Sequence, residues 1–382
     1  MGRVSGGKAV IYLDSAATSL LKPSTVEYAV SNAMRTMASP GRGGHDPAML
    51  AAETVFQCRE LAAELFHMRE PDHVVFTLNA THGLNLAVRS LARSGSTVTI
   101  SGFEHNSVTR PLHALDCRIR VAGRKLFDPE DTVRAFAEAL PGSEFAVCTV
   151  VSNVFGYLLP IGEIAELCRR EGVPLILDAS QAAGVLDLNF EELGASFLAM
   201  PGHKGLLGPQ GTGILLCKNQ AVPLLYGGSG SESRNQTMPE DLPDRLEAGT
   251  HNVCGIAGLK AGIEYVLSKS PAAILAHEKA LLDLAVRELQ KADCELFAGN
   301  GSDQTGVLSL RSAKWDCETL AMLLNDHQIC VRSGLHCAPL AHESAGTIET
   351  GTLRLSFSPF LKEKDVISAC SVLRTLLSVN QA

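Results

Sequence analysis

A lysine and an aspartate, each placed after an apolar segment, have the residue types and spacing for amine chemistry. Lys204 lies in a glycine-rich turn after the apolar run 197–200, and Asp178 ends the apolar run 173–177, 26 residues earlier. Burial favours the neutral, reactive form of a lysine amine, and a buried carboxylate needs a partner. Pyridoxal phosphate (PLP) needs such a pair, a lysine for its Schiff base and an acid to keep its pyridine nitrogen protonated. Taken alone, the lysine would be better interpreted as an ordinary surface residue of a loop.

A polar turn further upstream suits a phosphate group. The predicted strand 73–77 leads into a helix that begins near Thr81 and His82. Backbone NH groups and a hydroxyl at the start of a helix lie at the positive end of its dipole, where phosphates bind. Considered by itself, Thr81 is equally compatible with an ordinary N-cap.

Cys337 is a second candidate reactive group. It lies in a loop containing glycine and proline, next to His336 and five residues after Arg332. Nearby positive charge and partial exposure lower the pKa of a thiol, and the thiolate is the nucleophile. Three interpretations remain open: an inert cysteine, a nucleophile if the loop faces the lysine, or a zinc ligand. The candidate zinc ligands are Cys330, His336, Cys337 and His342, although an adjacent His-Cys pair does not match the usual ligand spacing.

Composition narrows the class of protein. The 382 residues are 46% apolar and 19% charged with a net charge of -8, and no segment concentrates basic residues, which argues against nucleic-acid or polybasic membrane binding. No apolar run is long enough to span a bilayer, and Met1–Lys8 lacks the apolar region of a signal peptide. Eleven cysteines without a Cys-x-x-Cys motif suit a reducing compartment. We therefore expect a cytoplasmic, globular protein.

Strands and helices alternate along most of the chain. An entry strand or extended arm leading to a polar turn is expected at 11–18. Strands are expected at 73–77, 97–100, 119–121, 145–151, 173–177 and 197–200, separated mostly by helices, and capping patterns at Ser24 and Asp46 indicate two N-terminal helices. This alternation implies an α/β fold with a mainly parallel sheet and helices on both faces. Polar residues just beyond strand ends converge on the ligand in such sheets. His105, Asn153 and Asp178 hold positions of that kind.

A change of pattern towards the C-terminus predicts two domains. A chain of 382 residues exceeds one average domain. After the helical tract 256–291, shorter segments predict a compact α+β lobe with strands near 305–310, 330–332 and 353–357. We assign residues 15–258 to a large domain, and residues 1–14 with 259–382 to a small α+β domain that carries the Cys337 loop.

These residues together resemble the class V aminotransferase family, and within it the cysteine desulfurases. The similarity extends from Tyr12-Leu-Asp-Ser-Ala-Ala-Thr18 to Arg354-Leu-Ser356, nearly the whole chain. Asp178-Ala-Ser-Gln181 and Gly202-His-Lys204 match the PLP motifs of the family, and Arg332-Ser-Gly-Leu-His-Cys-Ala338 matches its sulfur-handling loop. The 17-residue interval from Cys337 to Arg354 is similar to that of the short-loop branch, which also contains selenocysteine lyases. The fold that the resemblance implies is fold type I of the PLP-dependent transferases.

The resemblance implies a role for each matching residue. Around the cofactor ring, Lys204 binds PLP covalently and moves the α-proton, Asp178 pairs with the pyridine nitrogen, Gln181 bonds the ring hydroxyl and His105 stacks on the ring. Thr81, the backbone of His82 and His203 hold the phosphate. Thr250 reaches the cofactor of the partner subunit, which implies a homodimer. Asn153 and Arg354 bind the substrate carboxylate, Arg354 as a bidentate fork.

The implied reaction converts L-cysteine to L-alanine and leaves the sulfur on Cys337 as a persulfide, for transfer to an acceptor protein. Selenocysteine lyase is the close alternative, and another lyase or epimerase of the same fold would not need Cys337. A non-enzymatic cofactor-binding regulator would normally carry an added segment. Three positions depart from the family pattern: Pro201 and Ala80 replace phosphate-binding hydroxyl residues, and Leu335 replaces a second histidine.

Overall fold

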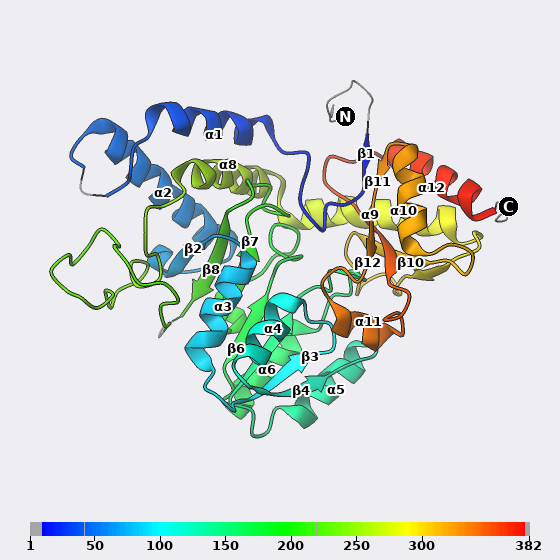
Figure 1. The fold of residues 1–382 in the computed structure, drawn as a ribbon, viewed down its shortest axis with the longest axis horizontal. Helices are drawn as coiled ribbons and strands as arrows, with labels where there is room; N and C mark the ends of the chain where they lie inside the picture. The colour runs from blue at the N-terminus through cyan, green and yellow to red at the C-terminus, as the bar shows by residue number, and fades with distance from the viewer. Residues whose placement is uncertain (1–9, 42, 219–220, 379–382) are drawn as a thin grey trace.

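Seven strands form the central sheet of the protein, as seen in a computed structural model that describes residues 10–41, 43–218 and 221–378 (Figure 1). In sheet order they are β2 (Val74–Thr77), β8 (Gly213–Cys217), β7 (Phe197–Pro201), β6 (Leu175–Asp178), β5 (Phe145–Thr149), β3 (Thr97–Ser101) and β4 (Arg118–Ala122). The strands from β7 to β4 pair in parallel, whereas β8 is antiparallel to both neighbours. The prediction of a mainly parallel sheet is confirmed.

Helices cover both faces of this sheet. Successive strand residues point to opposite faces, so a strand that is apolar at every position has two apolar faces to bury. In β6, Ile176 belongs to one apolar cluster and the next residue, Leu177, to another. The Ile176 cluster includes residues of α3 (Ala80–Leu91) and α4 (Asn106–Ala114). The Leu177 cluster includes residues of α2 (Asp46–Leu65), α5 (Pro129–Ala139), α6 (Ile161–Glu171), α7 (Phe190–Leu193) and α8 (Val253–Lys269). α1 (Ser24–Thr36) packs on α8, and the short 3-10 helix η1 (Pro71–His73) precedes β2.

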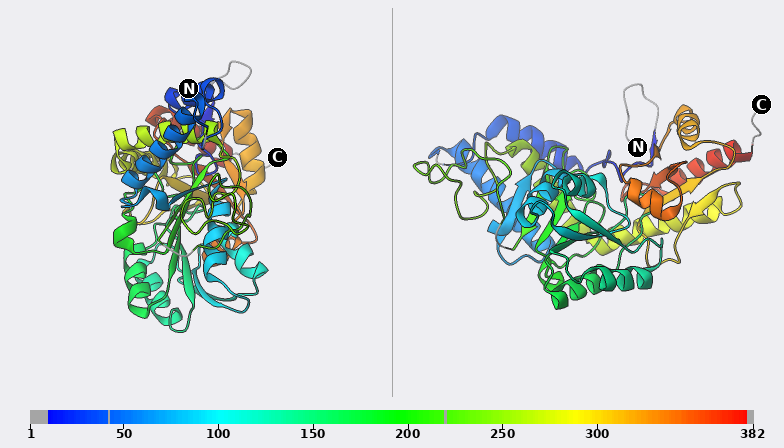
Figure 2. Two further views of the ribbon diagram at one scale, coloured as in Figure 1. Left: turned by 90° about the vertical axis from the view of Figure 1, so that its left-hand side faces the viewer. Right: turned by 60° about the horizontal axis from the view of Figure 1, so that its bottom comes forward.

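A smaller antiparallel sheet lies in the C-terminal part, at the right of Figure 1. Its order is β12 (Arg332–Gly334), β13 (Thr352–Ser356), β10 (Val307–Arg311) and β9 (Glu295–Phe297). A third apolar cluster joins this sheet to α9 (Pro271–Leu289), α10 (Cys317–Asp326) and α12 (Glu363–Ser378), and α11 (Pro339–Ala345) follows the Cys337 loop. β1 (Ile11–Tyr12) pairs in parallel with β11 (Ile329–Cys330), so the N-terminal segment lies beside this C-terminal part (Figure 2).

The division into two domains stays a prediction. The expected boundary after Gly258 falls inside α8, which packs on α1 and α2. Leu259, Ile263 and Val266, beyond that boundary, belong to the apolar cluster of the large sheet. The predicted position therefore cuts a continuous helix.

Several local predictions were wrong for identifiable reasons. α1 and α2 do begin at Ser24 and Asp46, but the N-cap positions are Pro23 and His45, and neither makes a side-chain cap bond. Of the strand or extended arm expected at 11–18, only Ile11–Tyr12 forms a strand, and the residues that follow turn and contact β13. α4 was not predicted, since Pro111 inside it removes a helical NH. None of the described helices is long and apolar enough to cross a membrane.

Candidate active site

An open pocket of about 680 Å³ lies where β5, β6 and β7 end and where α3 and α4 begin. Seven of the predicted site residues line it: Thr81, His105, Asn153, Asp178, Gln181, His203 and Lys204. The carboxyl ends of parallel strands meet at one edge of a sheet, which explains why residues far apart in the sequence converge there. The other predicted residues reach the pocket through hydrogen bonds or lie elsewhere.

Asp178 is the last residue of β6, and Lys204 follows the adjacent strand β7. Lys204 lies three residues after β7, in a turn closed by a 2.9 Å bond from Leu207 N to Lys204 O. Burial lowers the pKa of Lys204 to about 8, although the Asp178 carboxylate acts in the opposite direction. Asp178 is buried, and its Oδ1 accepts a bond from Ser180 N at 2.9 Å. The amine thus has a larger neutral fraction near pH 7 than an ordinary lysine, and it shares the pocket with an acceptor carboxylate.

His105 caps α4 with its own side chain. Its Nδ1 accepts a 3.0 Å hydrogen bond from Ser107 N, so the neutral ring carries its proton on Nε2. Burial lowers the pKa of His105, partly opposed by Asp178. The Ser107 hydroxyl also lies 2.7 Å from Thr81 Oγ1. Ser107 therefore connects the starts of α3 and α4.

The start of α3 presents NH groups to the pocket. Asn79 is its N-cap and its Oδ1 accepts the NH of His82 at 2.9 Å. The predicted phosphate donor, the His82 backbone, is therefore already bonded. The NH groups of Ala80 and Thr81 have no acceptor within the helix, as is general for a first turn.

The N-terminal segment closes over the lysine turn. His203 Nδ1 lies 3.0 Å from Thr18 Oγ1, and Ser19 N donates to His203 O at 2.9 Å. Burial, with help from the charges of Lys204 and Lys22, lowers the pKa of His203 to about 4, so the ring is neutral at pH 7. Gln181 Nε2 donates to Ala16 O at 3.0 Å.

Arg354 lies buried beside the pocket with an incomplete set of partners. Its Nη1 donates to Asn153 O at 2.8 Å and its Nη2 to Asp14 Oδ1 at 2.9 Å. Its Nε is buried and has no hydrogen-bond partner among the described residues. The Asn153 amide donates to His336 O at 2.8 Å, so both predicted substrate-binding residues are tied to neighbouring backbone.

The Cys337 loop is anchored at the rim of the pocket. Cys337 O accepts the NH of Asn106 at 2.8 Å, next to His105, and the thiol residue itself is exposed. His336 and Cys337 have φ angles of 49° and 57°, a left-handed conformation that residues with a Cβ rarely adopt. Within the described ranges, no three His, Cys, Asp or Glu side chains gather to hold a metal ion.

Comparison with known proteins agrees with this geometry. Residues 11–368 match the family model described as Aminotransferase class-V. The chain belongs to the class V aminotransferase family. A probable cysteine desulfurase of Haemophilus influenzae is 31% identical over 98% of this chain and 87% of its own, and one of Pyrococcus abyssi is 29% identical over 96% and 94%. The apo structure of the cysteine desulfurase from Thermococcus onnurineus NA1 is similar to this chain with a TM-score of 0.88, at 28% identity, over 96% of this chain and 94% of its own.

The pocket of this class V member has a donor set that fits PLP. A lysine amine, a buried carboxylate with one oxygen unbonded by any described residue, a capping imidazole and a helix N-terminus suit the aldehyde, pyridine, ring face and phosphate of the cofactor. Ala80 and Pro201 line the wall without hydroxyls, as the sequence indicated. Ser107 and Ser180 line the same wall and supply hydroxyl groups instead.

Three site residues were missed at the sequence level. Asp14 contacts Arg354 across 340 positions of sequence, and Ser107 lies within the unpredicted α4. Glu104 is fully buried next to His105, and burial raises its pKa to about 8. The available signal for Glu104 was its position beside His105, after an apolar strand. It was missed because glutamate is usually an exposed residue.

Thr250 and the His82 side chain lie apart from this pocket. They line a separate hollow of about 610 Å³ with Leu78, Leu225 and Leu246. Thr250 is exposed. In a single chain it therefore does not share the pocket of Lys204.

Proposed function

We propose that the protein is a PLP-dependent cysteine desulfurase that converts L-cysteine to L-alanine and takes the sulfur on Cys337. The observation that carries this proposal is the anchoring of the Cys337 loop to Asn106 and Asn153, at the pocket that holds Lys204 and Asp178. The backbone of the loop is thereby held beside the pocket, and its Cys337 is exposed. The relatives named cysteine desulfurase add support.

The residues of the pocket would hold PLP in a defined orientation. Lys204 would carry it covalently, Asp178 would keep its pyridine nitrogen protonated, and Gln181 would bond its ring hydroxyl. His105, with its proton on Nε2, would stack on the ring. Thr81, His203 and the free NH groups at the start of α3 would hold the phosphate, with Ser107 as an added hydroxyl.

In the reaction, this chain binds the substrate and moves one proton. When bound, PLP withdraws electron density from the substrate Cα. Arg354 would pair with the substrate carboxylate, assisted by the second NH of the Asn153 amide. The Lys204 amine would take the α-proton and later return a proton to the product, a role suited to a pKa near 8.

Cys337 would then attack the substrate sulfur as the thiolate. The new S–S bond forms as the C–S bond breaks, and the electron pair of that bond returns to the carbon side, where protonation gives L-alanine. The persulfide stays on the loop, where the exposed position of Cys337 leaves it open to a sulfur-acceptor protein. The relatives named cysteine desulfurase do not favour the selenocysteine lyase alternative. A homodimer with Thr250 reaching the partner's cofactor and a cytoplasmic location remain predictions.

Replacement of Cys337 by alanine tests this function. We expect Cys337→Ala to lower alanine and sulfide formation from L-cysteine by roughly 100-fold or more while the absorbance of the lysine-bound cofactor is kept. Cys254→Ala, at a half-buried cysteine of α8, is the control. Unchanged turnover of L-cysteine by Cys337→Ala would refute the sulfur assignment. Turnover that survives only with L-selenocysteine would favour the selenocysteine lyase.

A further inference from the structure

Asp14 bonds one of the guanidinium nitrogens of Arg354, the arginine that is expected to bind the substrate carboxylate. Its side chain is nearly buried, and its Oδ1 accepts from Arg354 Nη2 at 2.9 Å. Its Oδ2 accepts from Arg332 Nε at 3.2 Å. One carboxylate therefore bridges two guanidinium groups, one next to the pocket and one at the start of the Cys337 loop.

The guanidinium of Arg354 keeps an open position on the same edge. In a guanidinium, Nε and Nη2 point the same way and form the two-pronged edge that carboxylates prefer. Asp14 takes Nη2, whereas Nε has no partner among the described residues although Arg354 is only 2% exposed. A buried donor without an acceptor is unfavourable, so this edge is prepared for another oxygen.

The charges around Arg354 also leave room for an anion. The single carboxylate of Asp14 bonds two guanidinium groups, those of Arg332 and Arg354. With Lys204 bound to PLP and Asp178 paired with the pyridine nitrogen, these three side chains would keep one positive charge. The carboxylate of an amino-acid substrate would balance this set.

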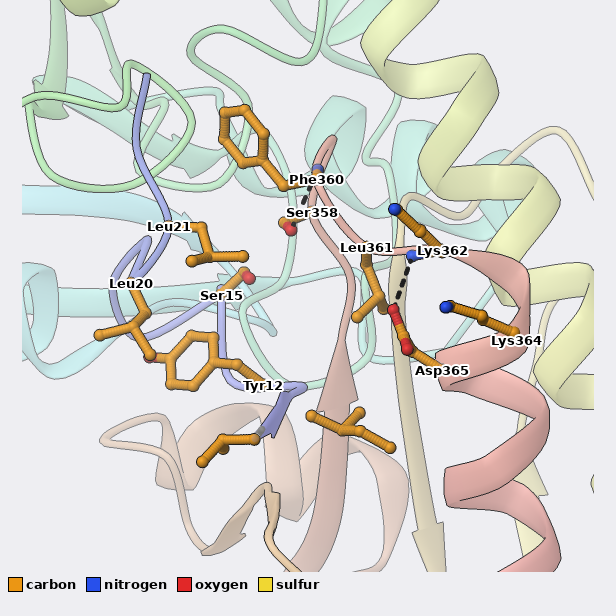
Figure 3. Close-up of a pocket in the computed structure, with 12 residues that line it drawn as sticks. Tyr12, Ser15, Leu20, Leu21, Ser358, Phe360, Leu361, Lys362, Lys364 and Asp365 are labelled. Carbon is orange, nitrogen blue, oxygen red and sulfur yellow. Dashed lines mark hydrogen bonds between the residues drawn. The ribbon is translucent and has the colours of Figure 1, made fainter. Parts of the chain in front are cut away.

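The segment that carries Asp14 has open space on one side. Tyr12 and Ser15 line a hollow of about 690 Å³, with Phe360 and Leu361 of the loop before α12 among the residues around it (Figure 3). Asp14 lies between Tyr12 and Ser15 in the sequence, and it also bonds Arg332, whose side chain is half exposed. If Asp14 released Arg354, its carboxylate would still be paired with Arg332.

From this geometry we infer that Asp14 is an internal counter-ion that holds Arg354 in position and is replaced there by the carboxylate of the substrate. Asp14 is thus a positioning residue. It holds the Arg354 guanidinium in place for the substrate carboxylate, and it competes with that carboxylate for the same guanidinium. This inference rests on the proposed function, because that function assigns the substrate carboxylate to Arg354.

Acetate binding to the cofactor-loaded protein tests the inference without turnover. Asp14→Asn keeps the shape but removes the competing charge, so we expect acetate to bind about fivefold more tightly and to raise the melting temperature more than in the wild type. Asp293→Asn, which removes one carboxylate from an exposed pair with Lys314, is the matched control. Loss of the acetate effect in Arg354→Lys would locate the binding at the Arg354 fork.

Kinetics with L-cysteine give the second measurement. Asp14→Asn should lower KM more than it changes kcat, and Asp14→Glu should restore both towards the wild type. A residue that only orients Arg354 gives the opposite sign, with weaker acetate binding and a higher KM in Asp14→Asn, and that result would overturn the inference. If the wild type makes no alanine from L-cysteine, the proposed function fails, and the acetate measurement still decides the role of Asp14.

Discussion

Glu104 shows how far a single residue can depart from its usual behaviour in this fold. It is fully buried, accepts hydrogen bonds from Ser101 Oγ and Thr149 N, and leaves its Oε2 without a partner among the described residues. Burial raises its pKa from 4.5 to about 8, more than the two hydrogen bonds lower it. The folded protein therefore keeps this carboxyl protonated at neutral pH.

This protonation gives the stability a specific dependence on pH. Below about pH 4.5 both states hold the proton, whereas between about 4.5 and 8 only the unfolded state releases it, so the free energy of unfolding falls as the pH rises. Glu104→Gln keeps the acceptor oxygen and cannot ionise. We expect the variant to gain stability relative to the wild type from about pH 5 to about pH 8, measured by urea unfolding. The exposed Glu138→Gln is the control, and a constant difference across that range would contradict the assigned pKa.

At the residue scale, the sequence identified the groups whose chemistry is evident from type and local context. Lys204, Asp178, His105 and Asn153 follow buried segments, and the structure brings all four to one pocket. The pairing of Asp14 with Arg354 was not predictable, because it depends on a contact between segments 340 positions apart. The bonded state of the His82 NH was missed because Asn79 and not Thr81 is the N-cap.

At the scale of elements, the turn after β6 and the turn that carries Lys204 are in backbone contact. Gly184 has a φ of 82°, and a Cβ added there would lie 2.4 Å from Gly205 O, next to Lys204. Gly205 in turn lies against Ala183 O. The position of the lysine thus depends on a close approach that only glycine allows.

Gly184→Ala should therefore displace the lysine turn. We expect a loss of about 2 kcal/mol or more in unfolding free energy and weaker retention of PLP, followed by urea unfolding and by cofactor absorbance. Gly172→Ala is the matched control, because Gly172 also has a positive φ, 66°, at the end of α6. No atom lies within 4 Å of the Cβ that would be added there. This substitution should cost about 1 kcal/mol and leave PLP binding unchanged. Equal PLP binding by the two variants would disprove the coupling between the turns.

Element prediction succeeded where apolar periodicity was strong and failed where local chemistry was misleading. β5, β6 and β7 are continuous apolar runs and were found within two residues. The tract 330–332 was expected as one strand, but it divides into β11 and β12, which join different sheets. A three-residue window cannot reveal that division, because the partners of the two strands, β1 and β13, are remote in sequence.

At the scale of the whole molecule, one predicted cofactor-binding residue lies outside the pocket of Lys204 in a single chain. Thr250 is exposed and lines a hollow separate from the pocket of Lys204. Large apolar side chains at Leu78, Leu225 and Tyr226 are also exposed, the first two around the same hollow. Exposed apolar groups beside an unused polar residue are typical of a protein interface. This arrangement supports the prediction of a homodimer in which Thr250 serves the partner's cofactor.

Mixing two inactive variants tests that arrangement directly. Lys204→Ala removes the amine, and Thr250→Asp places a negative charge beside the anionic cofactor of the partner. In a mixed dimer, one pocket has its own Lys204 and receives Thr250 from the other subunit, so co-refolding equal amounts should restore about a quarter of the wild-type activity. Sedimentation should give the mass of a dimer. Thr375→Asp, on the exposed face of α12, is the control and should be active alone. If Thr250 acts within its own chain, the mixture stays inactive, because no pocket then contains both residues.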